Sequence, residues 1–168
     1  MKPLLIVDGY NVIGAWREAE KLNWSLDESR DRLMHQLEDY SGYAGEEIVL
    51  VFDGYQSDRK MRTEETFGSL TLVFTCHGET ADSYIERLVA QTPKYRTVRV
   101  ATSDGLEQSQ VLATGATRMT SRELLRELKQ LRSNGMEAHR HQSLGRKQNL
   151  AGRLPEDTLQ MLEKLRRG

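Results

Sequence analysis

The chain of 168 residues contains one cysteine, three prolines and no long run of apolar residues. The single cysteine, Cys76, excludes a disulfide framework and any zinc site built from several thiolates. No apolar run approaches the roughly 20 residues of a membrane-spanning helix. The apolar stretch near the N-terminus is too short for the h-region of a signal peptide and runs into an acidic residue. These absences predict a soluble, cytoplasmic protein of about one domain.

A surplus of basic residues is also missing. The formal net charge is −1, whereas nucleic-acid-binding proteins usually carry an excess of Lys and Arg. The distribution of charge changes this picture, because residues 121–168 hold 11 Lys and Arg against 6 Asp and Glu, and residues 1–120 hold 13 against 19. The near-neutral total therefore combines an acidic body with a basic C-terminal segment.

Common phosphate-binding motifs are absent as well. There is no GxxxxGK[ST] loop and no GxGxxG fingerprint, which argues against a nucleoside triphosphatase or a dinucleotide-binding enzyme. The first apolar run ends in Asp8-Gly9-Tyr10 without a second aspartate two residues later. A haloacid-dehalogenase-like phosphatase would need that second carboxylate.

Apolar runs and helical periodicity alternate along the first 131 residues. Ser25 with Glu28, and Thr120 with Glu123, have the spacing of capping boxes. Strands are predicted at 4–7, 48–52, 70–74, 98–101 and 117–119, and helices at 26–43, 80–91, 106–113 and 122–131, with a surface loop at 55–67. This alternation predicts an α/β fold with a mainly parallel sheet covered on both faces.

The C-terminal segment has a different character. Residues 133–155 lack strong periodicity and include three glycines and a proline, which favours a linker or extended arm. Pro155 would occupy the first turn of a final helix. We therefore expect two parts. Residues 1–132 form an α/β domain, and residues 133–168 form a basic arm that ends in a helix.

Three of the predicted strands end in an acidic residue, and a fourth acid begins a helix. Asp8, Asp53 and Asp104 follow strands, and Asp82 lies in the first turn of the helix after the third strand. In a parallel sheet the ligand crevice lies outside the carboxyl ends of the strands. Four carboxylates converging there would need a divalent cation, and oxygen-only ligands favour Mg²⁺ or Mn²⁺. Such a site suits phosphodiester hydrolysis.

Each of these residues also has a purely structural interpretation. An Asp-Gly pair after a strand is common turn chemistry, and Asp82 or Glu79 could simply complement a helix dipole. Asn11 could orient a ligand or a water beside the metal, or it could close a turn. The recurrence of aspartate at successive strand ends carries the functional interpretation, rather than any one residue.

Four segments together resemble a known family. LLIVDGYNVIGAW, VLVFDGY, GETADSYIERL and VRVATSDGLEQ occur in order between about residues 3 and 131, and they resemble the YacP-like NYN domain family of the PIN-like nuclease superfamily. The resemblance implies a three-layer α/β/α PIN-like fold and metal-dependent endoribonuclease activity. It assigns catalysis to Asp8, Asp82 and Asp104, with Asp53 as a companion metal ligand and Asn11 in the polar position of the opening motif. It further implies messenger RNA as substrate, with the ribosome as a possible platform.

An RNA substrate must also be held by the protein. Residues 138–155 contain basic residues and no acid, and the loop after the second strand adds further cations and an aromatic ring. A basic arm suits contact with phosphates, and an aromatic ring suits base stacking. The predicted RNA-binding residues are Tyr55, Arg59, Lys60, Arg62, Arg140, Arg146, Lys147 and Arg153. An ordinary solvated surface is the alternative for both segments.

Two other functions remain open from the sequence. A non-catalytic RNA- or ribosome-binding adaptor could keep the fold without the reaction, although it would not need four aspartates. A small-molecule phosphatase would need a closed pocket and would leave the basic segment without a role. The RNA target and the oligomeric state are not indicated by the sequence.

Overall fold

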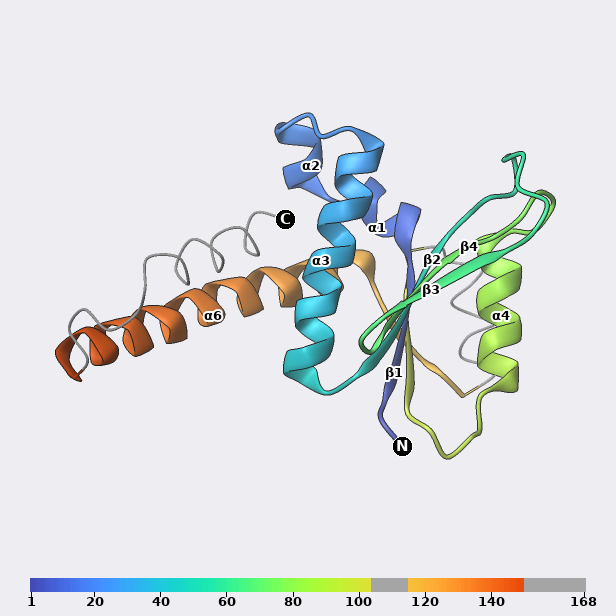
Figure 1. Cartoon of the computed structure of the whole chain (residues 1–168). Helices are drawn as coiled ribbons and strands as arrows, with labels where there is room; N and C mark the ends of the chain where they lie inside the picture. Colours follow the sequence, from blue (N-terminus) through green and yellow to red (C-terminus); the bar gives the residue numbers. More distant parts are fainter. Residues whose placement is uncertain (104–114, 150–168) are drawn as a thin grey trace. The chain divides into compact units, whose positions relative to one another are not determined.

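The computed structural model describes residues 1–103 and 115–149, with residues 136–149 described by their backbone alone. The chain divides into two compact units, Met1–Lys129 and Gln130–Gly168. The first unit holds the sheet, the helices that cover it and the start of the last helix (Figure 1). Within the described ranges, no helix is long and apolar enough to cross a membrane.

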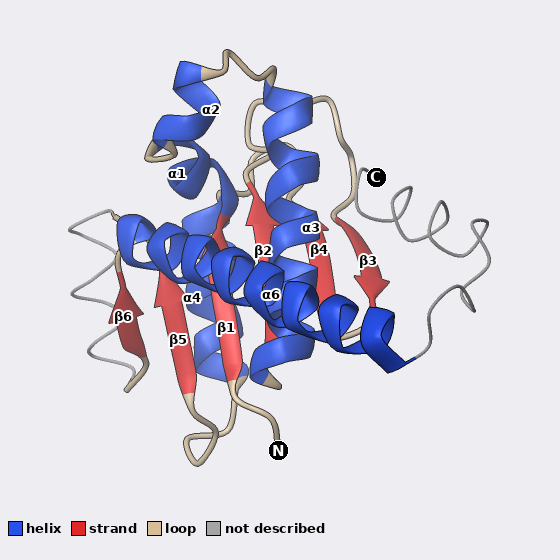
Figure 2. Ribbon diagram, turned by 90° about the vertical axis from the view of Figure 1, so that its left-hand side faces the viewer, coloured by secondary structure: helices blue, strands red, loops and turns tan. Residues whose placement is uncertain are grey.

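Six strands form one sheet in the order β3-β4-β2-β1-β5-β6 (Figure 2). All neighbouring pairs are parallel except β3 and β4, which are antiparallel. The strands are β1 (Leu4–Asp8), β2 (Glu47–Phe52), β3 (Thr63–Phe67), β4 (Leu70–Phe74), β5 (Val98–Ala101) and β6 (Thr117–Met119). The predicted α/β class and mainly parallel sheet are confirmed.

The helices begin and end where the local sequence allows. They are α1 (Gly9–Gly14), α2 (Arg17–Lys21), α3 (Leu26–Ala44), α4 (Ala81–Gln91) and α6 (Ser121–Asn149). Ser25 accepts a hydrogen bond from the backbone N–H of Glu28 at 3.1 Å, and Thr120 accepts one from Glu123 at 3.1 Å, so both predicted capping boxes form this bond. Gly45 ends α3 in the left-handed region at φ 66°, which glycine adopts without strain.

Different helices cover the two faces of the sheet. One core contains Leu4 and Ile6 of β1 together with Ile85 and Val89 of α4. On the other face, α3 buries Leu33 and Leu37 fully and packs against β2 and β4. Figure 1 shows α3 and α4 on either side of the strands. Because both faces are covered, β1 is apolar from Leu4 to Val7 and β2 from Ile48 to Phe52, without alternation of polar residues.

The order of the strands locates the crevice of the fold. From β1 the chain forms β2 beside it, then the outer strand β3, and returns as β4 between them, before it crosses to the other side of β1 to form β5. Ligands of open α/β sheets bind at the carboxyl ends of the strands beside such a reversal. In this protein the reversal places Asp8, at the end of β1, beside the segment that follows β5.

The first turns of α6 are tied to the first unit by a polar network. Arg99 of β5 donates to the Tyr40 hydroxyl at 3.0 Å and to Glu46 at 2.8 Å, and the Tyr40 hydroxyl donates to Glu127 of α6 at 2.9 Å. Burial of Arg99 lowers the pKa of its guanidinium. The hydrogen bond to Glu46 is the largest opposing effect, and the net result is a raised pKa. The network joins α3, β5 and α6 within this unit.

Two predictions about local structure are wrong. The loop predicted at 55–67 contains β3, which the apolar pattern missed because its residues are Thr, Glu, Glu, Thr and Phe and lie exposed at the edge of the sheet. The linker predicted from residue 133 is helical up to residue 149, although Gly135 and Gly145 disfavour a helix, and the sequence pattern offers no reason for it. The predicted helix at 106–113 and the helix after Pro155 lie outside the described residues.

Candidate active site at the carboxyl edge of the sheet

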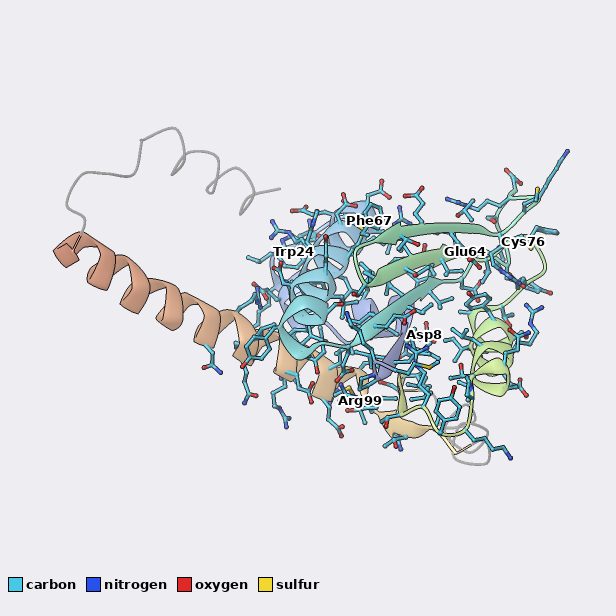
Figure 3. All side chains as sticks on the ribbon, turned by 60° about the horizontal axis from the view of Figure 1, so that its bottom comes forward. Asp8, Trp24, Glu64, Phe67, Cys76 and Arg99 are labelled. Carbon is cyan, nitrogen blue, oxygen red and sulfur yellow. The ribbon has the colours of Figure 1, made fainter. Side chains whose placement is uncertain are left out.

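Asp8 is the buried carboxylate of this edge. It is the last residue of β1 and is only 8% exposed (Figure 3). Side chains alternate along a strand, so Asp8 lies on the same face as Ile6, which packs in the α4 core. The next residue is Gly9, and a Cβ there would displace the buried ring of Phe52. Close packing at the start of α1 therefore favours glycine after Asp8.

Asp53 connects the end of β2 to the start of α4. Its Oδ1 accepts from the backbone N–H of Tyr55 at 2.8 Å, and its Oδ2 accepts from the backbone N–H of Ala81 at 3.0 Å. Ala81 is the first residue of α4, where a negative charge is favoured by the helix dipole. Both carboxylate oxygens thus hold backbone, which makes Asp53 a positioning residue for the first turn of α4.

Asp82 follows directly in that turn. It is an exposed residue at the second position of α4, and the bond from Ala81 to Asp53 fixes this turn against the end of β2. Asp8, Asp53 and Asp82 therefore belong to the same side of the carboxyl edge, the side covered by α4. Asp104 lies outside the described residues.

Asn11 joins three segments that are distant in the sequence. Its Oδ1 accepts from the backbone N–H of Ser103 at 2.8 Å and from the hydroxyl of Ser121 at 2.7 Å. A backbone N–H can only donate, so the side-chain atom facing Ser103 is the oxygen. The amide NH₂ group is consequently directed away from these two partners and keeps its donor character. Asn11 links α1, the segment after β5 and the start of α6 at the reversal of strand order.

The donor chemistry of this edge suits a hard divalent cation, since its candidate ligands are carboxylate oxygens. Among the residues described, no group of three His, Cys, Asp or Glu side chains is arranged to hold a metal ion. The four-carboxylate metal site remains a prediction that includes Asp104.

The loop after β2 is held against the loop before α4. Gly54 donates from its backbone N–H to the buried Thr75 hydroxyl at 2.6 Å, and that hydroxyl donates to the Glu79 carbonyl at 2.8 Å. Further along, His77 and Gly78 donate from the backbone to the carbonyls of Arg59 and Tyr55 at 2.8 and 3.0 Å. These bonds give the two loops one conformation beside Asp53.

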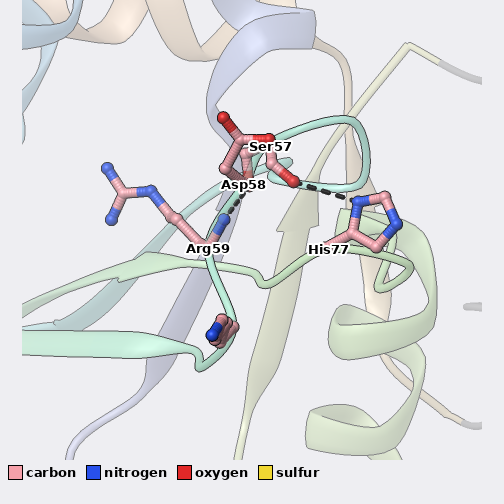
Figure 4. A pocket seen from close by; sticks show the side chains of 5 residues that line it. Ser57, Asp58, Arg59 and His77 are labelled. Atoms are coloured by element: carbon pink, nitrogen blue, oxygen red, sulfur yellow. Dashed lines mark hydrogen bonds between the residues drawn. The ribbon is translucent and has the colours of Figure 1, made fainter.

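The predicted RNA-binding residues of this loop divide into two groups. Tyr55, Arg59 and Lys60 are exposed. Beside the exposed cations is an open hollow of about 400 Å³ lined by Ser57, Asp58, Arg59, Lys60 and His77 (Figure 4). The second group is Arg62 alone, which is partly exposed and paired with Glu79.

Arg62 forms an ion pair that the sequence did not predict. Its Nε donates to Glu79 Oε1 at 2.9 Å, Nη2 donates to Oε2, and its guanidinium lies 4.6 Å from the Tyr84 ring centroid. Glu79 also pairs with Arg87. The hydrogen bonds from Arg62 lower the pKa of Glu79 to about 2, against the opposing effect of burial. Arg62 therefore fixes the segment leading into α4.

The remaining basic candidates belong to the second unit. Arg140, Arg146 and Lys147 lie in the part of α6 that is described by its backbone alone, and Arg153 lies outside the described residues. Their contact with RNA stays a prediction.

A mainly parallel α/β sheet with aspartates at its carboxyl edge is compatible with a nuclease-like domain, and comparison with known proteins shows the family. The model of the YacP-like NYN domain matches residues 5–167, and the chain belongs to this family. Family membership supports an RNA-cleaving function in general terms.

A protein and two crystal structures from Bacillus subtilis are similar to this chain. The protein YacP of Bacillus subtilis (strain 168) is 35% identical over 167 residues, which cover 98% of this chain and 97% of YacP. The crystal structure of Rae1 (YacP) from the same organism is 34% identical, with a TM-score of 0.70, and covers 100% of this chain and 96% of that one. A variant crystal structure of Rae1 matches at 32% identity and a TM-score of 0.67, covering 90% and 85% of the two chains.

Proposed function

We propose that this protein is a metal-dependent endoribonuclease that cleaves messenger RNA in association with the ribosome. The observation that carries the proposal is the buried Asp8 carboxylate at the reversal of strand order, on the same side of the edge as Asp82. A carboxylate in such a position, in a chain of a nuclease-like family, is suited to hold a cation against a phosphodiester.

In this mechanism Asp8, Asp82 and Asp104 would hold Mg²⁺ or Mn²⁺. The metal would activate a water and stabilise charge on the phosphoryl and leaving oxygens. Attack by water forms a new phosphorus–oxygen bond and breaks the bond to the leaving ribose oxygen, which takes up a proton. Asp53 supports the site by fixing the first turn of α4, which contains Asp82.

Asn11 has a separate role in the proposal. Its carbonyl oxygen holds Ser103 and Ser121, so its NH₂ group is the part that can donate to a phosphate oxygen. This orientation lets one side chain both position the edge and contact the substrate.

Assays with purified full-length protein and labelled single-stranded RNA test the proposal. We expect cleavage with Mg²⁺ or Mn²⁺, none with EDTA, and none for Asp8→Asn or Asp82→Asn with the melting temperature retained. Glu86→Gln, an exposed acid one turn beyond Asp82 on α4, is the matched control and should cleave normally. Full activity of either aspartate variant, or RNA binding without cleavage by the wild type, would contradict the enzyme and favour the adaptor.

The messenger RNA and ribosome part needs a different readout. Total RNA incubated with the protein, with and without ribosomes, should yield new 5′ ends within messages that are more abundant when ribosomes are present. Cleavage that is equal without ribosomes would reject the platform and leave the nuclease intact.

A further inference from the structure

Three aromatic rings lie along the carboxyl edge on the side opposite Asp8. The rings of Tyr10 and Phe52 have centroids 4.9 Å apart, and those of Phe52 and Phe74 are stacked at 5.3 Å. The neighbours Val51 and Val73 point into the α4 core, so strand alternation places Phe52 and Phe74 on the α3 side. The edge therefore has an acidic side toward α4 and an aromatic side toward α3.

Two arginines from distant segments meet at the last of these rings. The guanidinium carbon of Arg59, in the loop after β2, is 4.4 Å from the Phe74 centroid, and that of Arg30, on α3, is 5.9 Å from it. Arg30 also donates from Nη1 to the Tyr10 hydroxyl at 3.0 Å. We call Tyr10, Arg30, Phe52, Arg59 and Phe74 the arginine–aromatic patch, in which Phe52 is the buried base, 1% exposed, between the other two rings.

The patch can bind phosphate because of how the guanidinium groups are held. A guanidinium placed over a ring keeps N–H donors in its plane, where they match the oxygens of a phosphate. Arg59 uses one nitrogen in a 3.3 Å bond to Thr63, and its guanidinium makes no other hydrogen bond to the residues that the structure describes. By contrast, Arg62 and Arg87 both pair with Glu79 and are not equivalent sites for phosphate.

Arg30 carries a partner that a phosphate can replace. It pairs with Asp27 three residues earlier on α3, and the Asp27 side chain is 83% exposed. An ion pair with so exposed a carboxylate contributes little in water, whereas arginine–phosphate contacts are frequently bidentate and stronger. Asp27 therefore orients the Arg30 guanidinium, and a phosphate can replace Asp27 as its partner.

We propose that the arginine–aromatic patch binds the RNA backbone next to the scissile phosphate. The proposal rests on the proposed function, because the patch lies across the edge from the candidate catalytic aspartates. An anionic strand is repelled by the acidic side of the edge and needs cations beside it. Arg30 and Arg59 supply them, so the strand crosses the edge from the α3 side to the α4 side.

Equilibrium binding of a labelled single-stranded RNA in EDTA, measured by fluorescence anisotropy over a salt series, tests the patch without cleavage. Arg30→Gln and Arg59→Gln should each weaken binding severalfold and reduce the slope of log affinity against log salt by about 0.7, the value for one lost phosphate contact on a single strand. The double variant should lose both contacts, and Asp27→Asn should bind more tightly than wild type.

Arg32→Gln is the matched control. Arg32 is on the same helix, lies 4.2 Å from the Trp24 ring centroid and pairs with Glu28, but it is outside the patch. Its affinity and salt slope should stay at wild-type values, and melting temperatures should show that all variants are folded. Wild-type binding and slope in the double variant would overturn the patch while the nuclease stands. Absence of RNA binding and cleavage by the wild type would overturn the proposed function itself.

Discussion

The Asp53 carboxylate accepts a hydrogen bond from the backbone N–H of Ala81 at 3.0 Å. The two residues come from the end of β2 and the first position of α4. The bond makes the position of the α4 N-terminus depend on the end of a buried strand. Because Asp82 is the next residue, the same bond also fixes the position of its backbone.

Replacing Asp53 should therefore affect stability as well as activity. Asp53→Ala leaves the N–H groups of Tyr55 and Ala81 without this acceptor, and we expect the free energy of unfolding to fall by about 1–3 kcal/mol. Urea denaturation measures the loss. Asp58→Ala, an exposed acid in the same loop, should stay within about 0.5 kcal/mol of wild type. Equal stability of the two variants would show that Asp53 does not position α4.

Asn11 and the buried Ser121 should behave as a coupled pair. Asn11→Ala removes the acceptor of two donors, Ser103 N–H and the Ser121 hydroxyl, whereas Ser121→Ala removes one of them. We expect the first change to cost more free energy of unfolding, and a double-mutant cycle to show a coupling of about 0.5 kcal/mol or more. Additive losses would contradict a shared hydrogen bond.

The ion pairs of Glu79 predict how stability depends on pH. The folded state holds the pKa of Glu79 at about 2, below its ordinary value of 4.5. The carboxylate therefore stabilises the fold fully above pH 4.5, and this contribution declines as pH falls from 4.5 toward 2. Comparing chemical denaturation of wild type and Glu79→Gln across this range should show a difference that is largest at neutral pH and shrinks in acid. A difference independent of pH would contradict the assignment.

Gly54 should tolerate no side chain. A Cβ at this position would overlap the carbonyl oxygen of Thr75, which is backbone and cannot rotate away. Gly54→Ala should lower the free energy of unfolding by about 2 kcal/mol or more, since the two loops must separate. Gly14→Ala is the control, because nothing lies within 4 Å of its Cβ position, and it should be neutral or slightly stabilising. Thermal melts of both variants measure the contrast, and similar melting temperatures would reject it.

The sequence predicted the parts of the fold that depend on continuous apolar runs. β1, β2 and β4 are buried in a parallel arrangement, so their residues are apolar on both faces and stand out. β3 was missed because an exposed edge strand needs no apolar residues. The helix beyond residue 133 was missed because its residues form no apolar stripe and include Gly135 and Gly145, which disfavour a helix.

The candidate site was less accessible to sequence reasoning. Strand ends could be found locally, so Asp8, Asp53 and Asp82 were assigned to one edge. The partners of Asn11 are 92 and 110 residues away, and no local pattern encodes such a pairing. Arg62 was predicted to contact RNA from its charge, but its engagement by Glu79 depends on the antiparallel return of β3 against β4.

The exposed strand β3 also has a consequence for contacts between molecules. It forms an outer edge of the sheet, and unpaired edge strands invite a second copy to extend the sheet. Glu64 and Glu65 lie exposed at its centre, so a second copy in antiparallel register would bring carboxylates against carboxylates. The two glutamates of β3 make this strand hard to recognise in the sequence, and by the same charge they oppose aggregation through this edge.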